Sequence, residues 1–155
     1  MTTENQNSSA ADLTKRAPRS PRTRLGGYVL LPRMLDKGRA ELAGKNGEYH
    51  YNCPLDQHFV NFVKIDPAAV REQLEAGKGD GEILHWINET AEQKRTPWEI
   101  EQWSEYMLRR GPDSDAETRG YFGEMLGKIS QTREDITTWG DLLDLDDYVS
   151  FGGKA

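Results

Sequence analysis

The sequence predicts a mostly α-helical, compact single domain that carries an extended basic N-terminal arm and one small β-hairpin. Apolar residues recur every three or four positions through most of the chain, as they do on the buried face of a helix. Residues that start and stop helices separate these stretches, and alternating strand patterns are nearly absent. A length of 155 residues fits one domain, which we place at residues 12–155.

The N-terminal side predicts two segments without helices. Residues 1–11 are polar and lack apolar periodicity, so we expect a disordered tail. Residues 12–27 contain Pro18 and Pro21, which are incompatible with a regular helix at this place. We therefore expect residues 12–27 to form an extended arm along the surface of the domain.

The first helix is expected over residues 28–42, with Pro32 in its first turn and its end at Gly44. Its apolar positions at helical spacing are Leu31, Leu35 and Leu42. A tight turn at Asn46 and Gly47 then leads into residues 48–52, which we expect to form one strand of the hairpin.

The remaining helices are predicted from their start signals. A proline opens one helix, Asp-Pro opens the next, an aspartate caps the third, and Thr-x-x-Glu or Ser-x-x-Glu capping boxes begin two more. A last short helix is expected over residues 138–147. These signals lie at Pro54, at Asp66 and Pro67, at Asp80, at Thr96 and Glu99, and at Ser114 and Glu117.

Charge is unevenly distributed. Residues 12–45 hold nine basic and three acidic side chains, whereas the chain from residue 46 onward holds eleven basic and twenty-two acidic ones. Either the basic third docks on the acidic remainder of its own domain, or it binds an external anion. The acidic remainder disfavours binding of nucleic acid.

The second alternative assigns the anion to the arm and the first helix. Arg33 and Lys37 are four residues apart and share a helix face, while local ion pairing with Asp36 is the structural alternative. Arginine binds phosphate or carboxylate groups with two parallel hydrogen bonds. The candidate ligand-binding residues are Arg19, Arg22, Arg33, Asp36, Lys37 and Arg39.

A second group of reactive residues surrounds the only cysteine. His50, Cys53 and His58 lie within nine residues, with Asp56 between them. A closed zinc site needs four ligands and its spacing is not met, so we predict no metal and no cofactor. Cys53 precedes a predicted helix N-terminus, which makes Cys53, with His50 or His58 as the base, the candidate catalytic set.

Several short segments together resemble a bacterial family described as a domain of unknown function (serial label 5069). The resemblance covers nearly the whole chain after the tail and is most specific in the arm and the first helix. It implies a bacterial, cytoplasmic, single-domain protein and carries no activity, cofactor or site. The segments lie at residues 12–14, 18–22, 25–28, 31–33, 35–40, 51–56, 138–139 and 142–147.

The sequence contains no catalytic signature, so its function is not determined by its motifs. We favour a non-catalytic binding or regulatory module that recognises an anionic small molecule or a protein partner through the arm and the first helix. The alternative is a small cytoplasmic enzyme that uses Cys53 or a nearby histidine with an arginine anion clamp. No apolar run is long enough to cross a membrane, and a homodimer remains an open alternative.

Overall fold

The computed structural model describes residues 10–155 and is mostly α-helical, as predicted. The predicted tail at residues 1–11 lies almost entirely outside the described residues. No helix within residues 10–155 is long and apolar enough to span a membrane. The elements are β1 (Arg24–Leu25), β2 (Tyr28–Val29), α2 (Leu31–Leu42), α3 (Pro54–Val63), α4 (Pro67–Glu75), α5 (Asp80–Thr90), α6 (Pro97–Arg109), the 3-10 helix η1 (Ala116–Thr118), α7 (Arg119–Ile129) and α8 (Trp139–Ser150).

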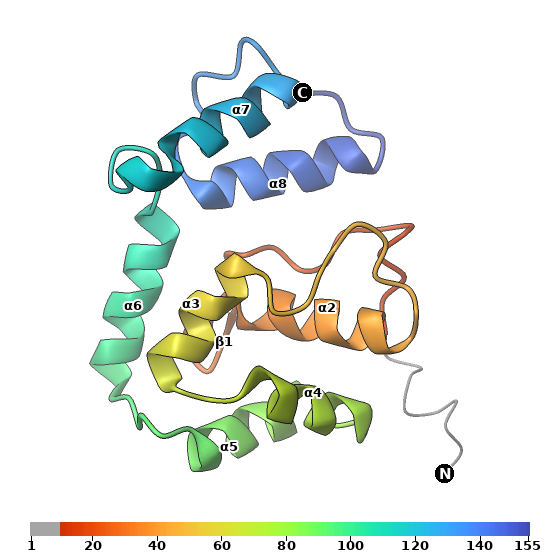
Figure 1. Ribbon diagram of the computed structural model, residues 1–155, viewed down its shortest axis with the longest axis vertical. Helices are drawn as coiled ribbons and strands as arrows, with labels where there is room; N and C mark the ends of the chain where they lie inside the picture. Colours follow the sequence, from red (N-terminus) through yellow and green to blue (C-terminus); the bar gives the residue numbers. More distant parts are fainter. Residues whose placement is uncertain (1–9) are drawn as a thin grey trace.

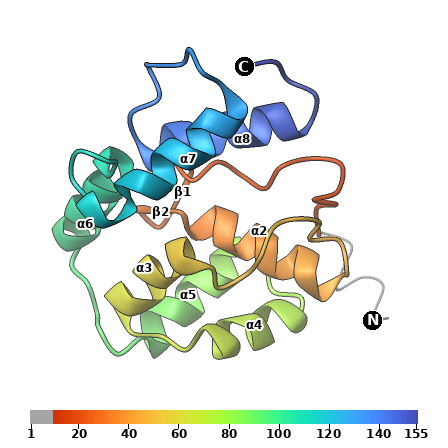
Figure 2. The same ribbon diagram turned by 45° about the horizontal axis from the view of Figure 1, so that its top comes forward.

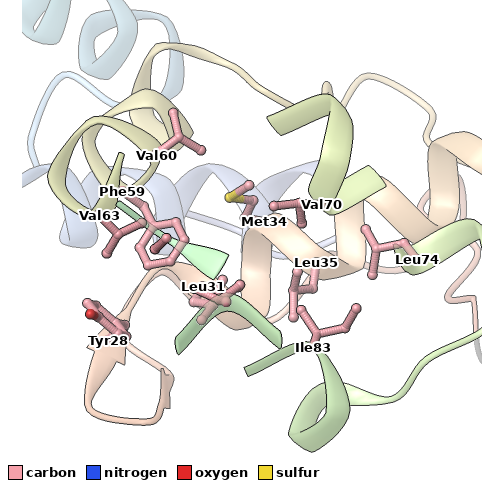
Figure 3. Packing of buried hydrophobic residues seen from close by; sticks show 12 residues of the cluster. Tyr28, Leu31, Met34, Leu35, Phe59, Val60, Val63, Val70, Leu74 and Ile83 are labelled. Carbon is pink, nitrogen blue, oxygen red and sulfur yellow. The ribbon is translucent and has the colours of Figure 1, made fainter. Parts of the chain in front are cut away.

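The larger hydrophobic core surrounds α2. Helices α3, α4 and α5 pack around it, and α6 runs along one side toward α7 and α8 (Figure 1). Leu31, Leu35 and Phe59 are completely inaccessible to solvent in this core (Figure 3). A Cβ atom at Gly38 would lie 2.6 Å from the Leu74 side chain, so the missing side chain lets α2 and α4 approach closely.

The hairpin lies in a different place from the predicted one. Strands β1 and β2 pair antiparallel, with Leu25 opposite Tyr28. Gly26 and Gly27 form the two-residue turn with φ angles of 60° and 85°, which glycine adopts without steric cost. The prediction of a strand at residues 48–52 is wrong, because these residues form an irregular loop.

The hairpin also shortens the first helix. Tyr28 and Val29 pair as a strand, so α2 begins at Leu31 and not at residue 28. Ser104 on α6 fixes this junction, because its hydroxyl donates to the Gly27 carbonyl at 2.7 Å. The same oxygen accepts a hydrogen bond from the Val29 amide at 3.3 Å.

Most of the predicted helix starts are confirmed. The side chains of Asp66, Thr96 and Thr138 each accept a hydrogen bond from a backbone amide of the helix that they precede. The prediction for Asp80 is wrong, because Gly79 is the N-cap and the Asp80 carboxylate binds arginines instead. The prediction for Ser114 is also wrong: its hydroxyl bonds within a turn to Gly111, and the main helix begins at Arg119.

Helices α7 and α8 form a second packed unit with its own small core. They pack face to face above α2 (Figures 1 and 2). The buried residues of this core are Phe122, Ile136, Trp139, Leu142 and Leu145. The α7–α8 unit is joined to the larger core through α6, through the polar contacts of the arm, and through Asp147 on α8, which binds Arg33 on α2 and Tyr49.

The arm passes between α8 and α2 and is held there by carboxylates (Figure 2). Arg19 binds Asp36 at 2.9 Å and Asp80 at 2.7 Å. Arg22 pairs with Asp141 and with Asp144, both on α8. The basic arm thus lies on acidic surface of its own chain.

Candidate functional site

A cavity of about 700 Å³ lies between the two packed units, and we call it the α8 cavity. Helix α8 lines it with Trp139, Leu143, Asp146 and Ser150, which repeat every three or four residues and form one face of the helix. Eleven residues of α-helix separate the first from the last of these, so this wall is about 16 Å long. The opposite wall comes from α2, α3 and the loop between them.

Two cations of α2 line the cavity, and each is paired with a buried carboxylate. The Arg33 guanidinium donates two hydrogen bonds to Asp147 on α8, at 2.8 and 3.2 Å. Lys37 Nζ lies 2.9 Å from the Asp56 carboxylate on α3. All four side chains are at most one-tenth exposed, so these pairs are shielded from water.

Tyr49 completes the pair at Asp147. Its hydroxyl donates to Asp147 at 2.7 Å, and the Arg33 guanidinium lies 5.5 Å from the centre of its ring. Burial and this hydrogen bond raise the pKa of Tyr49 above its ordinary value, so the phenol keeps its proton and remains a donor. The loop before α3 is thereby attached to α8.

Cys53 lies beside Lys37 at the N-terminus of α3. Lys37 Nζ donates to Cys53 Sγ at 3.1 Å, and the Cys53 amide donates to Asp56 at 3.3 Å. The cysteine is half-buried and its side chain lines the cavity. No hydrogen bond among residues 10–155 joins Cys53 to His50 or His58, so Lys37 is its polar neighbour.

Arg110 marks the end of the cavity near Trp139. Its guanidinium lies 5.9 Å from the centre of the Trp139 rings, and Nη2 donates to Asp115 at 2.9 Å. The Nε and Nη1 groups of Arg110 have no hydrogen-bond partner in the described part of the chain. Burial and the nearby Arg110 charge lower the pKa of His58, which therefore favours its neutral form.

Asp146 is the acid of α8 that lines the cavity. Asp141, Asp144 and Asp147 are each paired with an arginine, whereas Asp146 has no ion pair or side-chain hydrogen bond within residues 10–155. Burial and the neighbouring Asp147 raise the pKa of Asp146, while Arg33 opposes this effect.

Some of the predicted site residues lie together in the lining of the α8 cavity, and the others lie outside it. The predicted site residues that line the α8 cavity are Arg33, Lys37, His50, Cys53 and His58. Arg19, Asp36 and Arg39 form a separate network with Asp80 outside the cavity lining, and Arg22 lies on the acidic face of α8. Of the six candidate ligand-binding residues, Arg33 and Lys37 are therefore the two that line the cavity.

Most of the cavity lining was absent from the predicted site, including Arg110, Trp139 and Asp146. The four-residue and three-residue spacing from Trp139 to Ser150 was visible in the sequence as one helix face with mixed polarity. No sequence pattern identified Arg110. It directly follows the end of α6, and its place beside the cavity depends on its contact with the start of α8, where the Trp139 amide donates to the Arg110 carbonyl.

The chain is similar to one known protein family. The family model described as Domain of unknown function (DUF5069) matches residues 15–149. The chain belongs to this family. None of the curated proteins compared with the chain matches it. The match includes the arm from residue 15 onward and all the helices that line the cavity, except that it ends one residue before the last residue of α8.

Metal binding has little support in the geometry. No three His, Cys, Asp or Glu side chains of residues 10–155 come together as a group that could hold a metal ion. Cys53 and Asp56 are both in contact with Lys37, which occupies the position where a cation would otherwise lie.

Proposed function

We propose that this family member is a non-catalytic binding or regulatory module that holds a small organic anion in the α8 cavity. The observation that carries the proposal is a cavity of ligand size that combines apolar walls with buried cationic donors. Ligand sites in proteins have volumes of roughly 300–1,000 Å³ and are mainly apolar with a few placed polar groups. The apolar lining residues are Leu13, Leu55, Tyr121, Met125, Trp139, Leu143 and Phe151.

Arg110 is the cation best placed to bind the anion. Arg33, Lys37 and Arg110 are each paired with a carboxylate, but the pair of Arg110 with Asp115 uses only Nη2, and its Nε and Nη1 donate to no other group within residues 10–155. A planar guanidinium can hold a carboxylate or sulfonate with two parallel hydrogen bonds. The Trp139 ring beside it offers an apolar surface to the remainder of the ligand.

The proposal predicts that anilinonaphthalene sulfonate, an aromatic anion, binds in the cavity and fluoresces. Arg110→Met should weaken this binding about tenfold, because a charge-assisted hydrogen bond is lost while the side-chain length is retained. The measurement is a fluorescence titration of each folded protein, with folding checked by a cooperative thermal melt.

Two further variants make this test specific. Arg24→Met removes an arginine that pairs with Glu101 and Glu105 on the surface of α6, and it should leave the affinity unchanged. Leu143→Trp should weaken binding by placing a bulky ring in the apolar wall of the cavity without altering any charge. Equal affinities for all three variants and the parent chain would refute the proposed site.

The contact between Lys37 and Cys53 favours one alternative, a small enzyme with a cysteine nucleophile. A cation in contact with the sulfur and a helix N-terminus are features of activated cysteines. This alternative predicts that iodoacetamide alkylates Cys53 faster in the native protein than in the urea-unfolded chain. An equal or slower native rate, measured by mass spectrometry, would exclude the nucleophile.

We further propose that the protein acts in the cytoplasm of bacteria. The single cysteine, free and half-buried, supports a reducing compartment, and the resemblance of short segments of the sequence to a bacterial family supports a bacterial source. A protein partner is the remaining possibility for the module, and it would be favoured if no anion stabilised the protein in a thermal-shift screen.

A further inference from the structure

The four aspartates of α8 differ in whether they are paired with an arginine. Three of them are each paired with an arginine of the arm or of α2, and these are Asp141, Asp144 and Asp147. Asp146 alone lies on the helix face that lines the cavity, together with Trp139 and Leu143. The Asp146 carboxylate is half-buried and no side chain within residues 10–155 pairs with it, so a cationic group in the cavity could form a charge-assisted hydrogen bond with it.

Arg110 and Asp146, two charged residues of the cavity lining, lie at different points along α8. Arg110 is beside Trp139 at the start of the helix, and Asp146 follows seven residues later. Seven residues of α-helix correspond to about 10 Å. Apolar side chains, among them Leu143, line the wall between these two positions.

Other charged groups around Asp146 do not replace a ligand. Arg33 is the cation whose charge acts on Asp146, but both of its terminal nitrogens donate to Asp147. Glu48, which also lines the cavity, adds negative charge. The Tyr49 hydroxyl is likewise committed to Asp147, which leaves the Asp146 carboxylate as an open acceptor.

We propose that the ligand of the α8 cavity is dipolar: an anionic group binds Arg110, an apolar chain covers Leu143, and an amine binds Asp146. The chemical class is an amine separated by about 10 Å from a carboxylate or similar anion. This inference rests on the proposed function, since it adds a second recognition point to the same cavity. Asp146 is then the residue that distinguishes a dipolar ligand from a simple organic acid.

The test compares two probes that differ only at the far end, 8-aminooctanoate and octanoate. An eight-carbon chain spans about the distance from the start of α8 to Asp146. Isothermal titration calorimetry should show that the parent protein binds 8-aminooctanoate about tenfold more tightly than octanoate. Asp146→Asn should remove this preference, because the neutral amide no longer offers the amine a carboxylate.

Asp144→Asn is the matched control, because Asp144 lies on the same helix but binds Ser20 and Arg22 of the arm. It should retain the preference for the amine. If octanoate binds and 8-aminooctanoate binds no better, the dipolar ligand is refuted while the anion site stands. If neither probe binds the folded protein, the proposed function fails as well.

Discussion

Asp147→Ala is expected to lower the free energy of unfolding by about 3–5 kcal/mol, because it leaves a buried charge without its partner. The Arg33 guanidinium is almost inaccessible to solvent and donates two hydrogen bonds to this carboxylate. The Tyr49 hydroxyl would lose its acceptor at the same time. Urea denaturation followed by circular dichroism measures the change.

The double variant Arg33→Met and Asp147→Leu shows how much of the lost stability comes from leaving the Arg33 charge unpaired and how much comes from losing the ion pair itself. Replacing both members of a buried ion pair with apolar residues of similar volume is often neutral or stabilising. We therefore expect the double variant to recover most of the stability lost in Asp147→Ala. A double variant as unstable as the single one would show that the pair has a net stabilising effect beyond compensation of charge.

Phe59→Ala is expected to destabilise the protein by about 3–5 kcal/mol, because it opens a cavity in the larger core. Phe59 is completely buried, and its ring meets those of Tyr28 and Trp103 edge-to-face, with centroids 5.1 and 6.2 Å apart. The measurement is the midpoint and slope of unfolding in guanidinium chloride.

Trp98→Ala is the control for this change, since it also removes an aromatic ring. The Trp98 side chain is 62 % exposed on α6, and a surface substitution of this kind should change stability by no more than about 0.5 kcal/mol. Similar losses for both variants would mean that Phe59 does not lie in a close-packed core.

The helices were predictable because their start signals act locally. Asp66 and Thr96 cap helices through amides two or three residues away, so their effect is contained in the sequence around them. The hairpin was misplaced because its strands are two residues long and too short for an alternating pattern. Its one local signal was Gly26-Gly27, which the prediction assigned to the arm.

The cavity was less predictable, because it depends on contacts between distant residues. Arg33 and Lys37 were identified as one helix face, but the partner of Arg33 lies 114 residues later in the chain. Sequence spacing cannot show which of many acidic residues will neutralise a given cation. The open acceptor at Asp146 became visible only when its three neighbouring aspartates were found to be paired.

The position of the arm between α2 and α8 has a consequence for how the protein is made. Ser20 donates to Asp144, a residue synthesised 124 positions later, so the arm emerges from the ribosome long before its partners. Contacts of such long range close late and slow folding. The residues of the larger core are all synthesised before α8, whereas the α8 cavity can be completed only after α8 has been synthesised.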